Sequence, residues 1–252
     1  MVLSDRARSI GHGTLGVLLL LAAWEVIGTY RLVGSTWPSI SEIVVFAANP
    51  SRLALYGRAL AATAEAVVLG YLVGAAAGLA GATLVALIPA SRITTDITAA
   101  VINATPPIAL GPLFIVLLGH GAAPVALAAL NVFFVIYVSV NAGLLAVPRA
   151  RHDVFQVFGA SRGRTLLRLL IPSAMPHFLT GLRMAAPPAV IGAILGEWFG
   201  APRGLGVLIV SAMQNFQITL LWGAVMLASI VSIILFAAFG TLERLAIRRY
   251  GD

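Results

Sequence analysis

Long apolar stretches alternate with short polar segments along the 252-residue chain. Each of the longest stretches approaches or exceeds the roughly 20 residues that a helix needs to cross a lipid bilayer. They cover residues 16–33, 59–88, 98–118, 122–147, 178–199 and 221–242. The pattern therefore predicts an all-α, polytopic membrane protein with about six transmembrane helices.

The polar segments refine this prediction. Residues 1–15 are expected to form a cytoplasmic N-terminal segment, and residues 16–252 a transmembrane domain whose five-helix core covers about 59–242. Proline interrupts the third stretch at Pro106-Pro107 and the fifth at Pro187-Pro188. Because proline has no backbone N–H and clashes with the preceding helical turn, both pairs predict helix breaks.

Composition supports the membrane assignment and excludes several kinds of chemistry. The chain is 60% hydrophobic and only 10% charged, whereas a soluble domain has about 25% charged residues. It contains no cysteine, which excludes disulfides and thiolate metal sites. It also contains no lysine, and a P-loop needs a lysine to reach the nucleotide phosphates. If ATP drives the function of this protein, a partner must therefore bind the nucleotide and its magnesium.

The arginines predict the orientation in the membrane, because positive residues collect in cytoplasmic loops. An even number of spans places both termini on one side. With a cytoplasmic N-terminus, the inside segments hold eleven arginines: Arg6, Arg8, Arg92, Arg149, Arg151, Arg162, Arg164, Arg168, Arg244, Arg248 and Arg249. The outside segments hold four: Arg31, Arg52, Arg58 and Arg203. Both termini are therefore expected in the cytoplasm.

Residues 148–176 form a basic loop too polar for the membrane interior. Its pattern predicts a short helix over 153–158 and a backbone turn at Gly159, where a side chain would obstruct the path. Ser161 is placed to cap a second, leucine-rich helix, which Pro172 and Pro176 are expected to end. Such a loop suits either a groove on a soluble partner or the surface of anionic lipid.

This loop resembles the EAA loop of binding-protein-dependent ABC transporter permeases. The matching positions are Asp153, Val154, Phe155, Gly159, Ala160, Ser161, Arg162, Ile171 and Pro172. The first three depart from the family's Glu-Ala-Ala, while the glycine and proline positions agree. Segments 36–44, 106–121 and 196–209 are similar to other parts of these permeases, most of all to the branch that imports alkanesulfonates, taurine, nitrate and vitamin precursors.

The resemblance implies a type I importer (MetI-like) fold in the cytoplasmic membrane of a bacterium. The matching loop positions would form the coupling helix that docks on an ATPase subunit. Two permease copies, as a homodimer, would form the translocation pathway, two ATPase subunits would bind ATP and magnesium, and an external binding protein would deliver a small organic solute, anionic or vitamin-precursor-like. The chain itself would hold no cofactor and catalyse no reaction.

Several residues are candidates for the solute pathway, each with a structural alternative. Backbone breaks at membrane depth occur where the chain lines a cavity, which points to Pro106, Pro107, Pro187 and Pro188; simple kinks are the alternative. Glu197 is an ionisable group beside an apolar span. It either faces the pathway or extends to water beside Trp198. Asn103 lines the pathway or bonds across helices.

Other patterns carry less information. Gly70, Gly74, Gly78 and Gly81 form a small-residue stripe that suits helix packing within the chain or a dimer face. The four histidines show no metal-binding spacing, no motif indicates an enzyme, and nucleic-acid binding is not expected because the arginines are explained by orientation. An ion-gradient-driven secondary transporter and a non-transporting membrane scaffold remain as alternatives.

Overall fold

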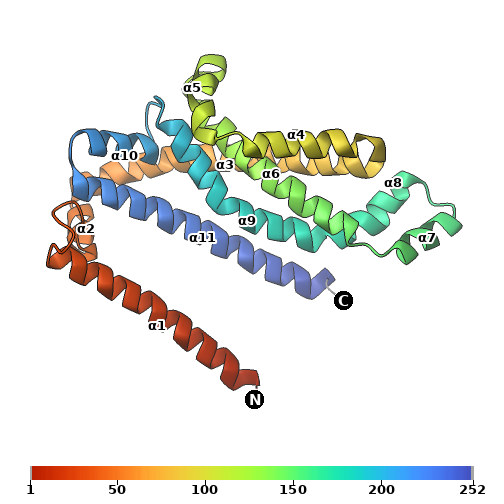
Figure 1. Cartoon of the computed structure of the whole chain (residues 1–252), viewed down its shortest axis with the longest axis horizontal. Helices are drawn as coiled ribbons and strands as arrows, with labels where there is room; N and C mark the ends of the chain where they lie inside the picture. The colour runs from red at the N-terminus through yellow and green to blue at the C-terminus, as the bar shows by residue number, and fades with distance from the viewer. Residues whose placement is uncertain (1, 251–252) are drawn as a thin grey trace. The chain divides into compact units, whose positions relative to one another are not determined.

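The structure, a computed structural model, describes residues 2–250, with side chains from Gly11 to Leu245. All regular elements in this part of the chain are helical, as predicted (Figure 1). The helices, in chain order, are α1 (Val2–Thr29), α2 (Ile40–Ala47), α3 (Pro50–Leu87), η1 (Pro89–Ser91), α4 (Arg92–Ala104), α5 (Pro107–Leu118), α6 (Ala123–Leu145), α7 (Arg149–Val157), α8 (Arg162–Thr165), η2 (Leu166–Leu170), α9 (Ile171–Glu197), α10 (Leu205–Gln214) and α11 (Ile218–Tyr250).

The described part of the chain contains five helical segments long and apolar enough to cross a membrane, or up to six if one bent pair counts as a span. The bent pair is the predicted third span, whose two helical pieces meet at an angle of 98°. The break lies at Pro106-Pro107, as predicted, while Pro112 lies inside α5 without interrupting it.

Two compact units can be described separately. The first comprises the residues up to Gly57 together with Leu208–Met226. In it the rings of Trp24, Trp37 and Trp222 pack together with centroids 5.0 to 5.4 Å apart. The indole N–H of Trp24 donates to the carbonyl of Pro38 at 3.1 Å, so α1 is fastened to the segment that precedes α2.

The second unit comprises Arg58–Val207 together with the residues from Leu227 onward. Its core forms around α6 and α9, where Val132, Ile136, Ala185 and Ala189 are fully buried. Small residues at such interfaces let helix backbones approach closely, which is the main source of packing between helices in lipid.

The glycine stripe of α3 packs against α6 within this unit. A Cβ added at Gly74 would lie 2.8 Å from the Cβ of Val132, and one at Gly78 would lie 2.9 Å from the Cβ of Ile136. Real side chains are never this close, so these positions have no room for alanine. The stripe therefore serves packing within the chain, one of its two predicted uses.

Two predictions about proline are wrong. Pro172 and Pro176 do not end a helix, because Pro172 lies in the first turn of α9 and Pro176 lies inside it. Pro187-Pro188 do not break a helix, because α9 continues through both residues to Glu197. Near Pro172 the π-helical turn η2 widens the backbone, which relieves the clash of the proline ring with the preceding turn. Around Pro187-Pro188 the neighbouring Ala185, Ala186 and Ala189 are fully buried, and this packing against α6 outweighs the lost backbone hydrogen bonds.

Candidate functional site

The loop between α6 and α9 begins with α7, which starts four residues earlier than predicted, at Arg149. Its end is the predicted turn: Gly159 has φ +66°, in the left-handed region that favours glycine. The amide of Gly159 donates to the carbonyl of Gln156 and that of Ala160 to the carbonyl of Phe155, both at 2.9 Å. These bonds satisfy carbonyls that the end of α7 would otherwise leave open.

Ser161 begins the second helix of the loop, also as predicted. Its hydroxyl accepts a hydrogen bond from the amide of Arg164 at 3.4 Å, a long N-capping contact at the start of α8. The helical path then continues through η2 into α9, so that Arg162–Glu197 is one helical segment of 36 residues. At about 1.5 Å per residue this segment is about 54 Å long, enough to cross a bilayer.

The apolar side chains of α7 divide between an outer and an inner face. Val157 and Phe158 are 85% and 83% exposed, and Val154, one helical turn earlier on the same face, is 52% exposed. Phe155 instead packs inward against a small cluster that includes Leu166 and Leu170. Of the matched loop positions, Phe155 is therefore not on the exposed apolar face, which Val154, Val157 and Phe158 form.

The other matched loop positions are distributed along α7, the glycine turn, α8 and the start of α9. Asp153 is exposed on α7, Ala160 follows the glycine turn, and Arg162 is exposed in the first turn of α8. Ile171 and Pro172 lie at the start of α9, directly after the π-helical turn. In Figure 1, α7 and α8 lie beyond the adjoining ends of α6 and α9. This arrangement presents an apolar patch at the end of two long helices of the same unit.

The proposed pathway residues are only partly brought together. Asn103 and Pro107 line a cavity of about 20 Å³ together with Asn131 of α6, and Pro106 adjoins it at the bend between α4 and α5. Such a space holds about one water molecule. Pro187 and Pro188 are not among the residues that line it. In this structure the bend therefore borders a small cavity lined by residues of α4, α5 and α6.

Glu197 does not extend to water, because its residue is only 2% exposed. One carboxylate oxygen accepts a hydrogen bond from the amide of Gly206 at 2.7 Å, while the neighbouring amide of Leu205 donates to the hydroxyl of Thr63 at 2.8 Å. Gly204, with φ +149°, lies so close that an added Cβ would collide with the carboxylate. Glu197 therefore holds the segment Gly204-Leu205-Gly206 against the end of α9.

An ion pair between α9 and α11 was not predicted. Arg183 bonds through its Nη1 to Glu243 at 3.0 Å and lies over the ring of Phe236 at 4.3 Å. The hydroxyl of Thr180 donates to the other oxygen of Glu243 at 2.5 Å. These residues are 60 positions apart in the chain, so no local pattern could have joined them. Ionisable groups at membrane depth are expensive unless paired in this way.

No group of three or more His, Cys, Asp or Glu side chains that could hold a metal ion occurs among the described residues.

Comparison with known proteins agrees with the fold. Residues 90–251 match the family described as "Binding-protein-dependent transport system inner membrane component". The formylaminopyrimidine transport permease protein ThiX of Halalkalibacterium halodurans is 32% identical over 237 residues, which cover 92% of this chain and 93% of that protein. The taurine transport system permease protein TauC of Escherichia coli (strain K12) is 26% identical over 95% of this chain and 89% of that protein.

A chain of the inward-facing MetNI methionine ABC transporter has the same fold, with a TM-score of 0.65 and 18% sequence identity over 79% of this chain and 99% of that one. The MetI-like fold and the resemblance to permeases for taurine, sulfonates and vitamin precursors are thus confirmed. The chain belongs to the binding-protein-dependent transport system inner membrane components and is a transmembrane permease subunit of an ABC importer.

Proposed function

We propose that α7, the Gly159 turn and α8 form the coupling element of this permease and dock on an ATPase subunit. The observation that carries the proposal is the exposed apolar face of Val154, Val157 and Phe158 at the end of a continuous helical segment. An apolar helical face in water is costly unless a partner covers it. A groove on a soluble protein takes such a face through residues spaced three and four apart.

The same element provides a route for motion. A displacement of α7 reaches α8 through the short Gly159–Ser161 connection, and α8 is continuous with α9 as far as Glu197. In the proposed mechanism, ATP binding by two partner ATPase subunits moves the coupling elements of two permease copies. The spans then alternate between inward- and outward-facing arrangements. This chain contributes the pathway, and the partners hydrolyse ATP.

The orientation and setting follow from the same proposal. Both termini and the coupling element would lie in the cytoplasm, in accordance with the eleven arginines of these segments, and the membrane would be the cytoplasmic membrane of a bacterium. An external binding protein would deliver the solute at the opposite side. The relatives named for formylaminopyrimidine, aliphatic sulfonates and taurine support a small organic solute, anionic or vitamin-precursor-like.

The experiment is ATP-dependent uptake of such solutes in vesicles that contain the permease, its operon's ATPase and its binding protein. Phe158→Ser should reduce uptake at least tenfold and weaken co-purification of the ATPase. The matched control Val116→Ser, at an 82%-exposed position on α5, should leave both unchanged. Uptake that survives ATP depletion but stops when the proton gradient collapses would instead identify a secondary transporter, and no uptake of any solute would favour a scaffold.

A further inference from the structure

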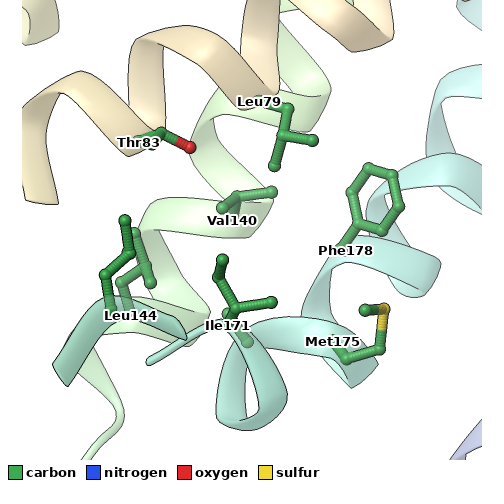
Figure 2. A pocket seen from close by; sticks show the side chains of 9 residues that line it. Leu79, Thr83, Val140, Leu144, Ile171, Met175 and Phe178 are labelled. Carbon is green, nitrogen blue, oxygen red and sulfur yellow. The ribbon is translucent and has the colours of Figure 1, made fainter. Parts of the chain in front are cut away.

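An apolar groove lies between α3, α6 and the start of α9, on the side of the second unit where the coupling element begins. Its volume is about 150 Å³. Figure 2 shows side chains from the three helices facing this common space. They include Leu79, Val140, Leu144, Ile171, Met175 and Phe178.

The groove belongs to the membrane-spanning part of the protein. Its walls come from three of the segments that are long and apolar enough to cross a bilayer: Pro50–Leu87, Ala123–Leu145 and Arg162–Glu197. Leu79 and Ile171 remain partly exposed at its edge. The surface of a membrane-spanning segment in a permease faces lipid, another protein or the solute pathway, and the largely apolar lining of this groove favours lipid or protein over an aqueous pathway.

The size of the groove suits a hydrocarbon chain. An apolar protein cavity of about 150 Å³ holds a molecule the size of benzene, so this groove has room for about six carbons of an acyl chain. Because a lipid tail is already in an apolar medium, its gain on entering the groove would come from van der Waals packing and not from leaving water. Thr83 supplies a hydroxyl among the otherwise apolar side chains that line the groove.

Positive charge is concentrated at the end of the groove next to the coupling element. Arg168 lies one helical turn before Ile171, and Arg164 one turn before Arg168. Both are exposed, and neither forms an ion pair with any residue whose side chain the structure describes. The α6 wall ends at Leu145 and is followed by Arg149 and Arg151.

Few acidic groups oppose these arginines. Asp153 is the one acidic residue in positions 148–176, and Asp96 on α4 is already paired with Arg92 at 3.5 Å. Arginine binds phosphate through two parallel hydrogen bonds and loses less hydration energy than lysine in doing so. Clusters of arginine beside membrane helices on the cytoplasmic side attract anionic lipid headgroups.

We propose that this groove binds an anionic phospholipid of the inner leaflet, with one acyl chain between α3, α6 and α9 and the phosphate on Arg168 and Arg164. The choice of leaflet rests on the orientation given under the proposed function. The lipid would then contact the π-helical turn η2, through which α8 continues into α9. It is a ligand of the permease distinct from the transported solute.

The test uses the full chain in lipid nanodiscs containing a trace of phosphatidylglycerol or phosphatidylcholine that carries a photoreactive diazirine near the middle of one acyl chain. Labelled residues are located by mass spectrometry. Phosphatidylglycerol should label the groove residues Leu144 and Met175 about fivefold more than phosphatidylcholine does. This factor corresponds to the attraction between one arginine near the membrane surface and an anionic headgroup. Arg168→Gln should remove most of this preference, whereas Arg203→Gln, at an exposed arginine of the loop after α9, should not.

A second pair of variants tests the apolar part. Leu144→Trp should fill the groove and reduce labelling there, whereas Val116→Trp on the exposed surface of α5 should not. If Leu144→Trp lowers the melting temperature, Thr83→Leu provides a milder replacement within the same groove.

Equal labelling by the two lipids, or labelling unaffected by Arg168→Gln, would overturn the proposal. So would loss of the label on addition of the ATPase, or on dimer formation, because the occupant would then be protein. The proposed function is tested separately: co-purification of the ATPase and ATP-dependent uptake would persist if only the lipid site is wrong.

Discussion

Glu243 on α11 accepts an ion-pair hydrogen bond from Arg183 on α9, with 3.0 Å between Oε2 and Nη1. Glu243 is the more buried partner, and Thr180 donates to its second oxygen. The pair therefore joins the helix that continues the proposed coupling element to the last helix of the chain. Its removal should have a cost that an exposed pair does not have.

Glu243→Ala should destabilise the purified protein by about 2 kcal/mol, because it leaves the Arg183 guanidinium without its charged partner. Thermal unfolding in detergent measures the effect as a lower melting temperature. The matched control is Arg92→Gln, which removes an exposed pair with Asp96 that is worth about 0.5 kcal/mol or less. Equal losses in melting temperature would show that the α9–α11 pair stabilises the protein no more than an exposed pair does.

Thr63→Val should loosen the segment that follows α9. The hydroxyl of Thr63 accepts the amide of Leu205 at 2.8 Å, and the valine variant leaves this buried amide without an acceptor. The expected loss of stability is about 1–3 kcal/mol. Limited proteolysis between Trp198 and Leu205 should become faster, and Thr63→Ser, which keeps the acceptor, should protect the segment as the native residue does.

Glu197→Ala should have a larger effect than Glu197→Gln. The carboxylate accepts the amide of Gly206 at 2.7 Å, and a glutamine carbonyl oxygen can accept the same bond, while alanine cannot. Melting temperatures of the two variants provide the comparison. A glutamine variant as unstable as the alanine variant would mean that the negative charge, and not the hydrogen bond, holds the segment.

Gly74→Ala should weaken the contact between α3 and α6, since an added Cβ would lie 2.8 Å from the Cβ of Val132. Overpacking of this kind costs about 1–3 kcal/mol. Gly57→Ala is the control on the same helix, because nothing lies within 4 Å of its added Cβ. That variant should be neutral or slightly stabilising, and similar losses at both positions would contradict the packing described here.

Hydropathy and local chain chemistry predict much of this structure. Length and apolarity locate the spans, the Pro106-Pro107 pair locates the bend of 98°, and Gly159 and Ser161 locate the turn and cap of the loop. These features depend on neighbouring residues, so a sequence pattern contains them.

Features that depend on distant contacts could not be predicted in this way. Pro187-Pro188 lie in a continuous helix because α6 packs against the alanines beside them. Phe155 turns inward because Leu166 and Leu170 offer it an apolar surface. The partner of Arg183 is 60 residues away, and the hydrogen bond of Glu197 to Gly206 depends on the path of the intervening loop.

Docking of the exposed α7 face on the ATPase can be tested directly, because the chain contains no cysteine. Val157→Cys and the equally exposed Val116→Cys each introduce a single thiol, which a maleimide–succinimide reagent can link to lysines of a co-expressed ATPase. We expect a cross-linked permease–ATPase product with Val157→Cys and none with Val116→Cys. No product from Val157→Cys, or equal products from both, would contradict the assignment of α7 as the coupling element.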